Sequence, residues 1–214
     1  MPSLTTLRRL ACALTLTCLP LHLWAADIDA SPCELDDQWS ELEGDAMRKA
    51  AEAGHASAQY NLGLAYDAGD GVDTDAEEAF HWYRKAAEQG HACAQYNLGV
   101  AYDRGEGATQ DEEKANYWYR KAAEQGDADA QYNLAVSYEE GTGIERDLKQ
   151  AFNWYLKAAK QGDAAAQLAV GDCYAKGRGT ERNLRQARHW YQKAADQDDE
   201  EAHKKLVRLP RNND

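Results

Sequence analysis

The sequence predicts an all-α protein built as an α-solenoid of helix-turn-helix repeats, and three observations support this prediction. The 36-residue stretch at 91–126 recurs before and after itself at an unbroken spacing. Glycines stand at the same two positions of every copy, where a helix would end. The 214 residues include only 4 prolines, so long helices are not interrupted. A fixed period of this length is typical of a repeat array, in which each unit buries a face against the next.

Four copies of the repeat lie in register, at 55–90, 91–126, 127–162 and 163–198. When each copy is numbered from its first residue, positions 4, 8 and 12 carry Ala, then Leu or Val, then Tyr. Their spacing of four places them on one stripe of a first helix, here called helix A. Position 9 is small enough for a neighbouring helix to approach closely. It is occupied by Gly63, Gly99, Ala135 and Gly171.

Helix A is expected to end at position 15, which is always Gly and suits a left-handed helix cap. A second helix, helix B, is predicted from position 22 to 34, with Ala at 25, Trp at 28, Tyr at 29 and Ala at 32 and 33. The Gly-x-Gly between them is not a phosphate loop, because it follows a helix and lacks the third Gly. Each repeat is therefore an antiparallel helix pair.

The pattern resembles the Sel1-like repeat family, the 36-residue relatives of tetratricopeptide repeats. The matching features are Ala at 4, Leu-Gly at 8 and 9, Tyr at 12, Gly-x-Gly, Ala at 25 and a WYxKAA run. That run stands at 82–87, 118–123, 154–159 and 190–195. The resemblance covers 55–198 and implies a right-handed superhelix whose helices A line the concave side. It says little about function, because these positions build the solenoid.

The two ends of the chain differ from the repeats. Residues 1–26 are predicted to be a signal peptide, since Arg8 and Arg9 precede an apolar run that closes on Ala25-Ala26. We therefore expect a periplasmic protein without integral membrane insertion after cleavage, because the run is too short to span a bilayer. Residues 27–54 are predicted to form an N-terminal segment with a capping helix of type B. Residues 199–214 form a capping helix of type A and a tail.

The charge of the chain indicates the chemistry of its partners. The formal net charge is −13, and it becomes −15 once residues 1–26 are removed. Nucleic acid and anionic membrane surfaces are disfavoured, because both require a basic footprint. Another protein with a basic surface is favoured. The acidity is concentrated toward the N-terminus, since the first repeat carries −5 and the fourth +1.

Three cysteines remain after removal of the first 26 residues: Cys33, Cys93 and Cys173. Cys93 and Cys173 lie two repeats apart, which is roughly 20 Å at 8–10 Å per helix layer. A disulfide needs Cα atoms within about 7 Å, so these two should not pair. Pairing of Cys33 with Cys93 stays open, and the sequence does not determine the oligomeric state.

The candidate partner-binding residues stand at positions 6, 7 and 10 of helix A, which face away from the stripe at 4, 8 and 12. A ladder of Tyr beside aliphatic residues, edged by Asn and by carboxylates at position 13, has the composition of a protein-binding groove. The same side chains could instead pack between adjacent helices, so both interpretations stay open. The residues are Tyr60, Asn61, Leu64, Tyr96, Asn97, Val100, Tyr132, Asn133, Val136, Leu168 and Asp172.

No catalytic residue, metal site or cofactor is predicted. The acidic loop at 67–78 lacks the order of acids and Gly that an EF-hand needs, and the histidines show no zinc-binding spacing. No G-x-S-x-G nucleophile motif occurs. Some secreted Sel1-like proteins are described as β-lactamases, but those have cysteine pairs inside each repeat and this chain has none. A secreted hydrolase of that type is therefore disfavoured.

The resemblance implies a non-catalytic scaffold that holds another protein on its concave face. Within that class, small size and acidity favour an immunity or inhibitor protein that sequesters a toxic effector, such as a type VI secreted phospholipase. The alternative is an envelope adaptor that regulates a sensor kinase or exopolysaccharide assembly.

Overall fold

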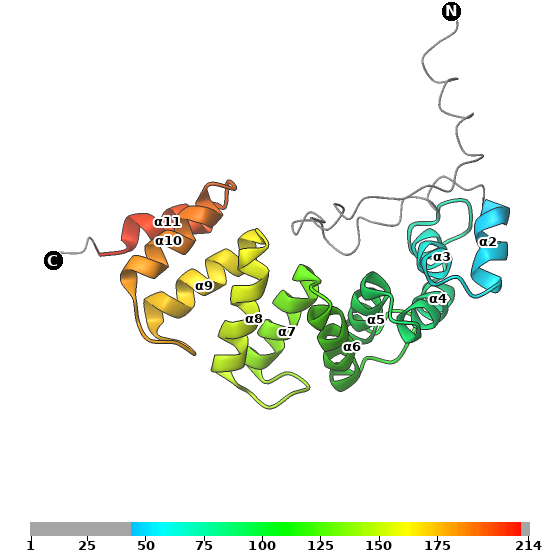
Figure 1. Cartoon of the computed structure of the whole chain (residues 1–214), viewed down its shortest axis with the longest axis horizontal. Helices are drawn as coiled ribbons and strands as arrows, with labels where there is room; N and C mark the ends of the chain where they lie inside the picture. Colours follow the sequence, from blue (N-terminus) through cyan, green and yellow to red (C-terminus); the bar gives the residue numbers. More distant parts are fainter. Residues whose placement is uncertain (1–43, 211–214) are drawn as a thin grey trace, which may run out of the picture.

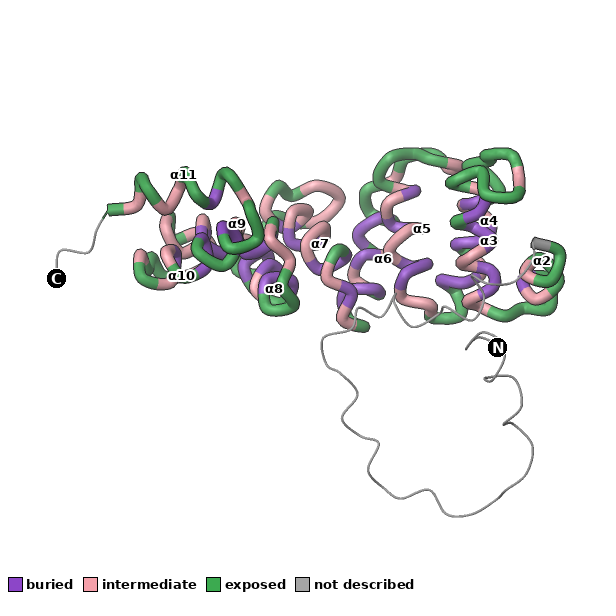
Figure 2. The backbone as a smooth tube through the Cα atoms, turned by 90° about the horizontal axis from the view of Figure 1, so that it is seen from above, coloured by how far each residue is buried: buried purple, intermediate pink, exposed green. Residues whose placement is uncertain are grey.

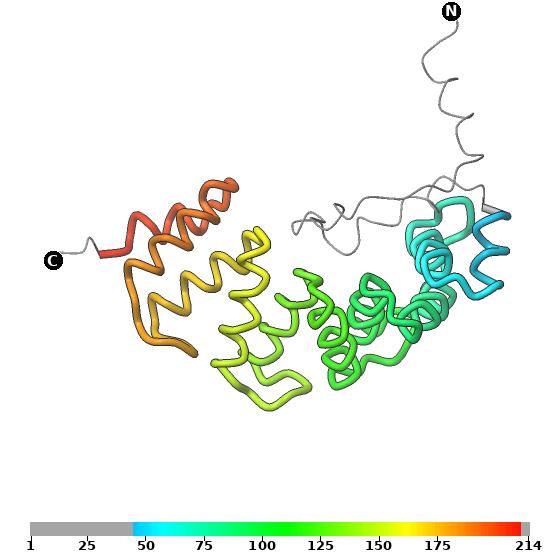
Figure 3. Tube along the Cα trace, viewed as in Figure 1, coloured from blue at the N-terminus to red at the C-terminus, as the bar shows by residue number. Residues whose placement is uncertain are grey.

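The computed structural model describes residues 44–210, which form ten helices and no strand. These helices follow one another along a single arc with an open hollow (Figures 1 and 3). The all-α helical repeat solenoid predicted from the sequence is confirmed. The predicted signal peptide at 1–26 and most of the N-terminal segment lie outside the described residues.

Each repeat contributes one helix A and one helix B, and consecutive helices pack against each other. α3 and α5 lie nearer the hollow of the arc than α4 and α6 (Figure 1). The helices A are α3 (Ala56–Ala68), α5 (Ala92–Arg104), α7 (Ala128–Glu140) and α9 (Ala164–Lys176). The helices B are α4 (Ala76–Glu88), α6 (Glu112–Glu124), α8 (Leu148–Lys160) and α10 (Leu184–Ala195). The array is flanked by α2 (Gly44–Glu52) and α11 (Glu200–Arg208).

The helix ends follow from residues that recur in every repeat. Helix A ends at a glycine in the left-handed region, with φ of 72° at Gly69 and 80° at Gly141. Helix B begins after a residue whose side chain accepts backbone N–H groups of the first turn, as Asp75 does from Glu77 and Glu78. Such caps satisfy donors and acceptors that a helix leaves unpaired at its ends.

The core consists of alanines packed against aromatic rings. The alanines at positions 4, 25, 32 and 33 are buried in all four repeats, and so is the tyrosine at position 29. Buried residues run along the whole array (Figure 2). The predicted burial of positions 4 and 8 is confirmed in all four repeats. At position 12 only Tyr138 is buried. The other position-12 rings are half-buried, since they lie at the edge of the helix pair.

Position 9 is small because the position-29 tyrosine of the same repeat lies against it. A Cβ added at Gly63 or Gly99 would stand 2.6 Å from the ring of Tyr83 or Tyr119. This distance is shorter than any ordinary van der Waals contact, so a methyl group added at Gly63 or Gly99 would force the tyrosine ring or the helix to move. The sequence-based expectation of close helix approach is confirmed.

A ladder of glutamines, which the 36-residue pattern did not predict, links each repeat to the unit before it. The buried Gln at position 5 donates to a backbone carbonyl of the preceding helix B, as Gln95 does to Ala87 at 3.1 Å. Its Oε1 accepts from the Gln at position 35 of its own repeat, as from Gln125 at 2.7 Å. The pattern repeats at Gln59, Gln131 and Gln167. Buried amides in such an array need partners, and here both ends of each amide have one.

The cysteines agree with the distance argument from the sequence. Cys173 is a free, buried thiol, so it does not pair with Cys93, which is disulfide-bonded. Cys33 lies outside the described residues. Within residues 44–210, no helix has both the length and the apolar character needed to cross a membrane.

Candidate protein-binding face

The structure places the predicted partner-binding residues at an intermediate depth. Leu64 is exposed, with 37% of its surface accessible, and the other ten residues are half-buried. They are thus neither sealed between helices nor fully open to solvent. The packing interpretation describes part of what these side chains do, and the partner-binding interpretation stays a prediction.

The three tyrosines at position 6 pack on the tyrosine at position 29 of the same repeat. Ring centroids lie 6.0 Å apart for Tyr60 and Tyr83, and 5.5 Å apart for Tyr132 and Tyr155. Tyr60 also stacks on His91 of the next repeat, at 4.7 Å. Each of these rings therefore packs between two helices, and only part of its surface remains accessible.

A cleft opens between the first two repeats and contains three of the predicted residues, Leu64, Asn97 and Val100. It encloses about 150 Å³ between α3, α4 and α5. Its walls combine aliphatic and aromatic surface with acidic, amide and guanidinium groups. The remaining lining residues are Asp67, Ala76, Phe80, Tyr83, Ala101, Arg104 and Glu106.

Each repeat also holds a tyrosine–carboxylate pair. Its tyrosine lies on helix B and was not predicted to belong to this face. The position-29 hydroxyl donates to the carboxylate at position 13, from Tyr83 to Asp67 at 2.5 Å and from Tyr119 to Asp103 at 3.4 Å. In the third repeat Tyr155 donates to Glu139 at 2.9 Å. The sequence signal was present in the acid that recurs 16 positions before each of these tyrosines.

The fourth repeat keeps the pair by moving its acid one helical turn. Position 13 is Ala175, and Tyr191 donates instead to Asp172 at position 10, at 2.7 Å. Residues three apart share a helix face, so the carboxylate still reaches the hydroxyl.

Burial fixes the protonation state of these tyrosines. Burial first, and then the adjacent carboxylate, raises the pKa of Tyr83, Tyr119, Tyr155 and Tyr191 above the ordinary value. The phenols therefore remain neutral and donate their hydroxyl protons to the carboxylates.

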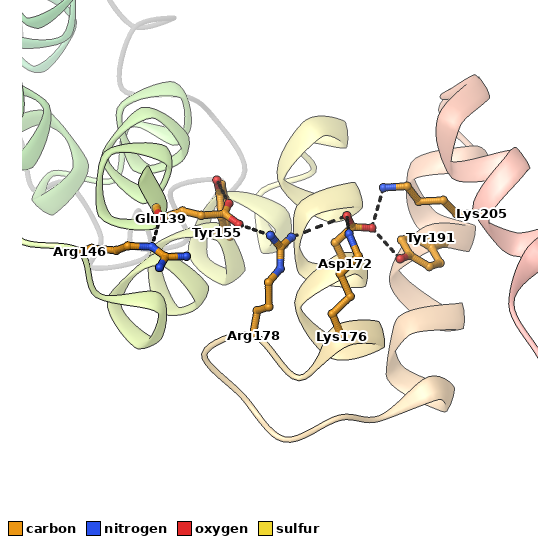
Figure 4. A network of polar contacts seen from close by, with 8 residues as sticks. All are labelled: Glu139, Arg146, Tyr155, Asp172, Lys176, Arg178, Tyr191 and Lys205. Atoms are coloured by element: carbon orange, nitrogen blue, oxygen red, sulfur yellow. Dashed lines mark hydrogen bonds and ion pairs between the residues drawn. The ribbon is translucent and has the colours of Figure 1, made fainter. Parts of the chain in front are cut away.

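At the C-terminal end, the carboxylates are neutralised by cations from the chain itself (Figure 4). Arg178 lies between Glu139 at 2.6 Å and Asp172 at 3.7 Å. Lys205 of α11 lies 2.6 Å from Asp172, and Lys176 lies 3.0 Å from it. Although burial opposes ionisation, the hydrogen bonds from Lys205, Tyr191 and Lys176 lower the pKa of Asp172.

The two predicted residues of the fourth repeat thus belong to the end of the face. Asp172 is engaged by the ion network, and Leu168 packs among the alanines of α10 and α11 and Leu206. The structure does not bring them together with Leu64, Asn97 and Val100.

The described part of the chain contains no group of three or more His, Cys, Asp or Glu side chains placed to hold a metal ion. The acidic segment at 67–78 runs from the end of α3 through the connecting loop into the first turn of α4, and its six acidic side chains are exposed.

Comparison with known proteins agrees with this architecture. The Sel1 repeat model matches residues 56–91, 94–127, 128–163 and 164–199. A search of curated proteins gives no match. A protective antigen with an SLR fold from uropathogenic Escherichia coli is 40% identical with a TM-score of 0.75, over 78% of this chain and 36% of that one.

Two further solved structures are similar. A Sel1 repeat protein from Oxalobacter formigenes is 38% identical with a TM-score of 0.71, over 77% of this chain and 48% of that one. Cysteine-rich protein B of Helicobacter pylori is 27% identical with a TM-score of 0.50, over 64% of this chain and 99% of that one. The chain spans less than half the length of the Escherichia coli and Oxalobacter proteins. The four matched repeats and these similarities show that the chain belongs to the Sel1 repeat family.

Proposed function

We propose that the chain is a non-catalytic scaffold that binds another protein on the face formed by its helices A. Sel1 repeat proteins generally serve as scaffolds for protein interaction. The observation that carries the proposal is the cleft between the first two repeats, which presents aliphatic, aromatic and charged surface together. Binding surfaces with an apolar centre and polar surroundings of this kind are typical of protein–protein recognition.

The proposal is tested by partner capture from an envelope extract. Leu64→Gln and Val100→Ala alter the lining of the cleft and leave the buried tyrosines at position 29 unsubstituted. Tyr117→Ala is the matched control, because Tyr117 is 53% exposed on α6 and does not line the cleft. We expect wild-type and Tyr117→Ala proteins to retain the same partner, and the two cleft variants to lose most of it. Equal recovery by all four proteins, each shown to be folded by circular dichroism, would refute the proposal.

We further propose that the protein acts in the periplasm as an inhibitor that sequesters a toxic effector, such as a type VI secreted phospholipase. Three features support this role: the signal-peptide pattern at 1–26, the net charge of −13 and the absence of a catalytic motif from the sequence. A strongly acidic protein associates rapidly with a basic effector surface.

The inhibitor role is tested by expressing, in the periplasm, a lipase or toxin that is encoded beside this gene. Co-expression of the full chain should restore growth, whereas co-expression without residues 1–26 should not. Growth inhibition that persists with the exported chain would exclude the inhibitor role and leave the scaffold proposal intact.

A further inference from the structure

The four tyrosine–carboxylate pairs differ in whether a cation of the chain lies on them. In the third repeat, Nη1 of Arg178 lies 2.6 Å from Glu139. In the fourth, Nζ of Lys205 lies 2.6 Å from Asp172 and 5.9 Å from the ring centre of Tyr191. Both cations come from the unit that follows the pair along the chain. In both pairs the carboxylate holds a basic side chain, and in the fourth repeat that side chain also lies over the tyrosine ring.

The first two pairs have the same tyrosine and the same acid but no such cation. Asp67 and Asp103 are exposed, and no Lys, Arg or His nitrogen of residues 44–210 lies within 4.0 Å of either carboxylate. The reason can be read from the sequence. The position held by Arg178 in the fourth repeat is Glu106 in the second and Thr142 in the third.

The residues that correspond to Lys205 are amides at these two pairs. Lys205 stands at position 7 of its unit, where the second and third repeats have Asn97 and Asn133. Although the larger effect of burial still raises both pKa values, Asn97 lowers the pKa of Tyr83 and Asn133 lowers that of Tyr119. An asparagine side chain carries no charge, so at these two pairs it does not supply the cation that Lys205 supplies to Asp172.

The pair formed by Tyr83 and Asp67 borders the cleft between the first two repeats. Leu64, Phe80 and Val100 provide apolar surface beside it, which suits the aliphatic part of a long basic side chain. Arg104 also lines this cleft, but its ion-pair partner is Glu106 at 3.9 Å, and both side chains are well exposed.

We propose that the pairs Tyr83–Asp67 and Tyr119–Asp103 are seats for two basic side chains of the partner protein. The inference rests on the proposed scaffold function and specifies the chemistry of the segment that it binds. Equivalent points on neighbouring repeats lie on the order of 10 Å apart, one packed helix layer. An extended segment rises about 3.3 Å per residue, so its two basic residues should be about three positions apart.

A library of random dodecapeptides displayed on phage, selected against the full chain, tests this inference. Enriched peptides should carry Lys or Arg at two positions three or four apart. The variant Asp67→Asn/Asp103→Asn should lose this enrichment, and the best peptide should bind it at least about tenfold more weakly. Asp70→Asn/Asp73→Asn removes the same charge from exposed loop positions and is the matched control. It should behave like the wild type.

A further variant tests whether the cation already in the cleft opposes a basic partner, and the loop control separates direct binding at the two pairs from general attraction. Among the described residues, Arg104 is the one cation that lines the cleft, so Arg104→Gln should leave binding unchanged or strengthen it. If both double variants weaken binding equally, the effect is long-range attraction and the two seats are refuted.

Failure of the inference is distinguishable from failure of the scaffold function. Enriched peptides without paired basic residues that bind wild type but not Leu64→Gln would refute the seats and leave the scaffold in place. Absence of any enriched peptide, or enrichment that survives in the Asp67→Asn/Asp103→Asn variant, would also overturn the proposal.

Discussion

At the scale of single residues, position 9 shows how one methyl group decides the geometry of a repeat. Three repeats have Gly there and the third has Ala135, which is fully buried. The third repeat differs in two further ways. Its acid is Glu139 instead of Asp, and the rings of Tyr132 and Tyr155 meet at 54°, against 37° for the corresponding rings in the second repeat. We infer that the methyl turns the tyrosine and that the longer acid preserves the hydrogen bond.

Gly99→Ala should therefore destabilise the protein, although alanine favours a helix. Its Cβ would meet the Tyr119 ring at 2.6 Å. Overpacking typically costs about 1–3 kcal/mol, which exceeds the ~1 kcal/mol gained from helix propensity. Urea denaturation followed by circular dichroism measures the effect.

The second substitution Asp103→Glu should recover part of that loss, because it restores the combination found in the third repeat. A Gly99→Ala variant more stable than the wild type would contradict the packing explanation. So would a double variant whose loss of stability equals the sum of the two single losses.

The buried thiol of Cys173 gives a second prediction at this scale. Burial raises its pKa to about 11, and only 3% of its surface is accessible. Since the thiolate is the reactive form, native protein at pH 8 should leave Cys173 unmodified by iodoacetamide. Peptide mass spectrometry should find it alkylated only after addition of denaturant. Rapid modification of the native protein would show that α9 opens locally.

At the scale of elements, the glutamine ladder joins successive helix pairs. Gln131 donates to the carbonyl of Ala123 at 3.1 Å and accepts from Gln161 at 2.9 Å. Gln131→Leu removes both hydrogen bonds and leaves buried polar groups without partners, which costs about 1–3 kcal/mol. Gln150→Leu is the matched control, because Gln150 is exposed on α8.

Denaturation should show a lower free energy of unfolding for Gln131→Leu and an unchanged one for Gln150→Leu. Because repeats contact only their neighbours, hydrogen exchange should accelerate in α6, α7 and α8 more than in α3. Equal stability of the two variants would indicate that the ladder is not a significant link between repeats.

Helix positions follow from the sequence because their causes are local. The caps, the glycine stops and the alanine stripes act within one or two turns, so the 36-residue pattern predicts them. The ladder was missed because Gln95 finds its partners 8 and 30 residues away. The tyrosine–carboxylate pairs were only half predicted. The acids at position 13 were assigned to the face, but their tyrosines belong to the other helix.

The end of the face was not predictable from one repeat at a time. Asp172 and Leu168 look like variable groove residues in the sequence, yet α11 covers them. Only the docking of the last helix determines which positions remain open.

At the scale of the whole molecule, the protein should lose stability in alkaline solution. The pKa of the four position-29 tyrosines is raised by burial and by adjacent acids. Their contribution is fully present below the unfolded-state pKa of about 10 and is lost as pH rises toward the higher folded-state values. Urea midpoints measured from pH 8 to 11 should therefore fall, and the fall should be smaller for Tyr155→Phe. A midpoint independent of pH in this window would contradict the buried, neutral state of these phenols.

The charge gradient along the array gives the face a direction. The carboxylates of Asp67 and Asp103 are exposed and without an ion pair to the described residues, whereas those of Glu139 and Asp172 hold Arg178 and Lys205. A bound segment should therefore place its basic end over α3 and α5.

Site-specific photo-crosslinking in living cells tests the central claim most directly. A photoreactive amino acid would replace Leu64 in the cleft or Tyr117 on α6, both of which are exposed. We expect illumination to give one discrete crosslinked protein from position 64 and none from position 117. Crosslinks from position 117 alone would place the binding surface on the helices B and contradict the proposal.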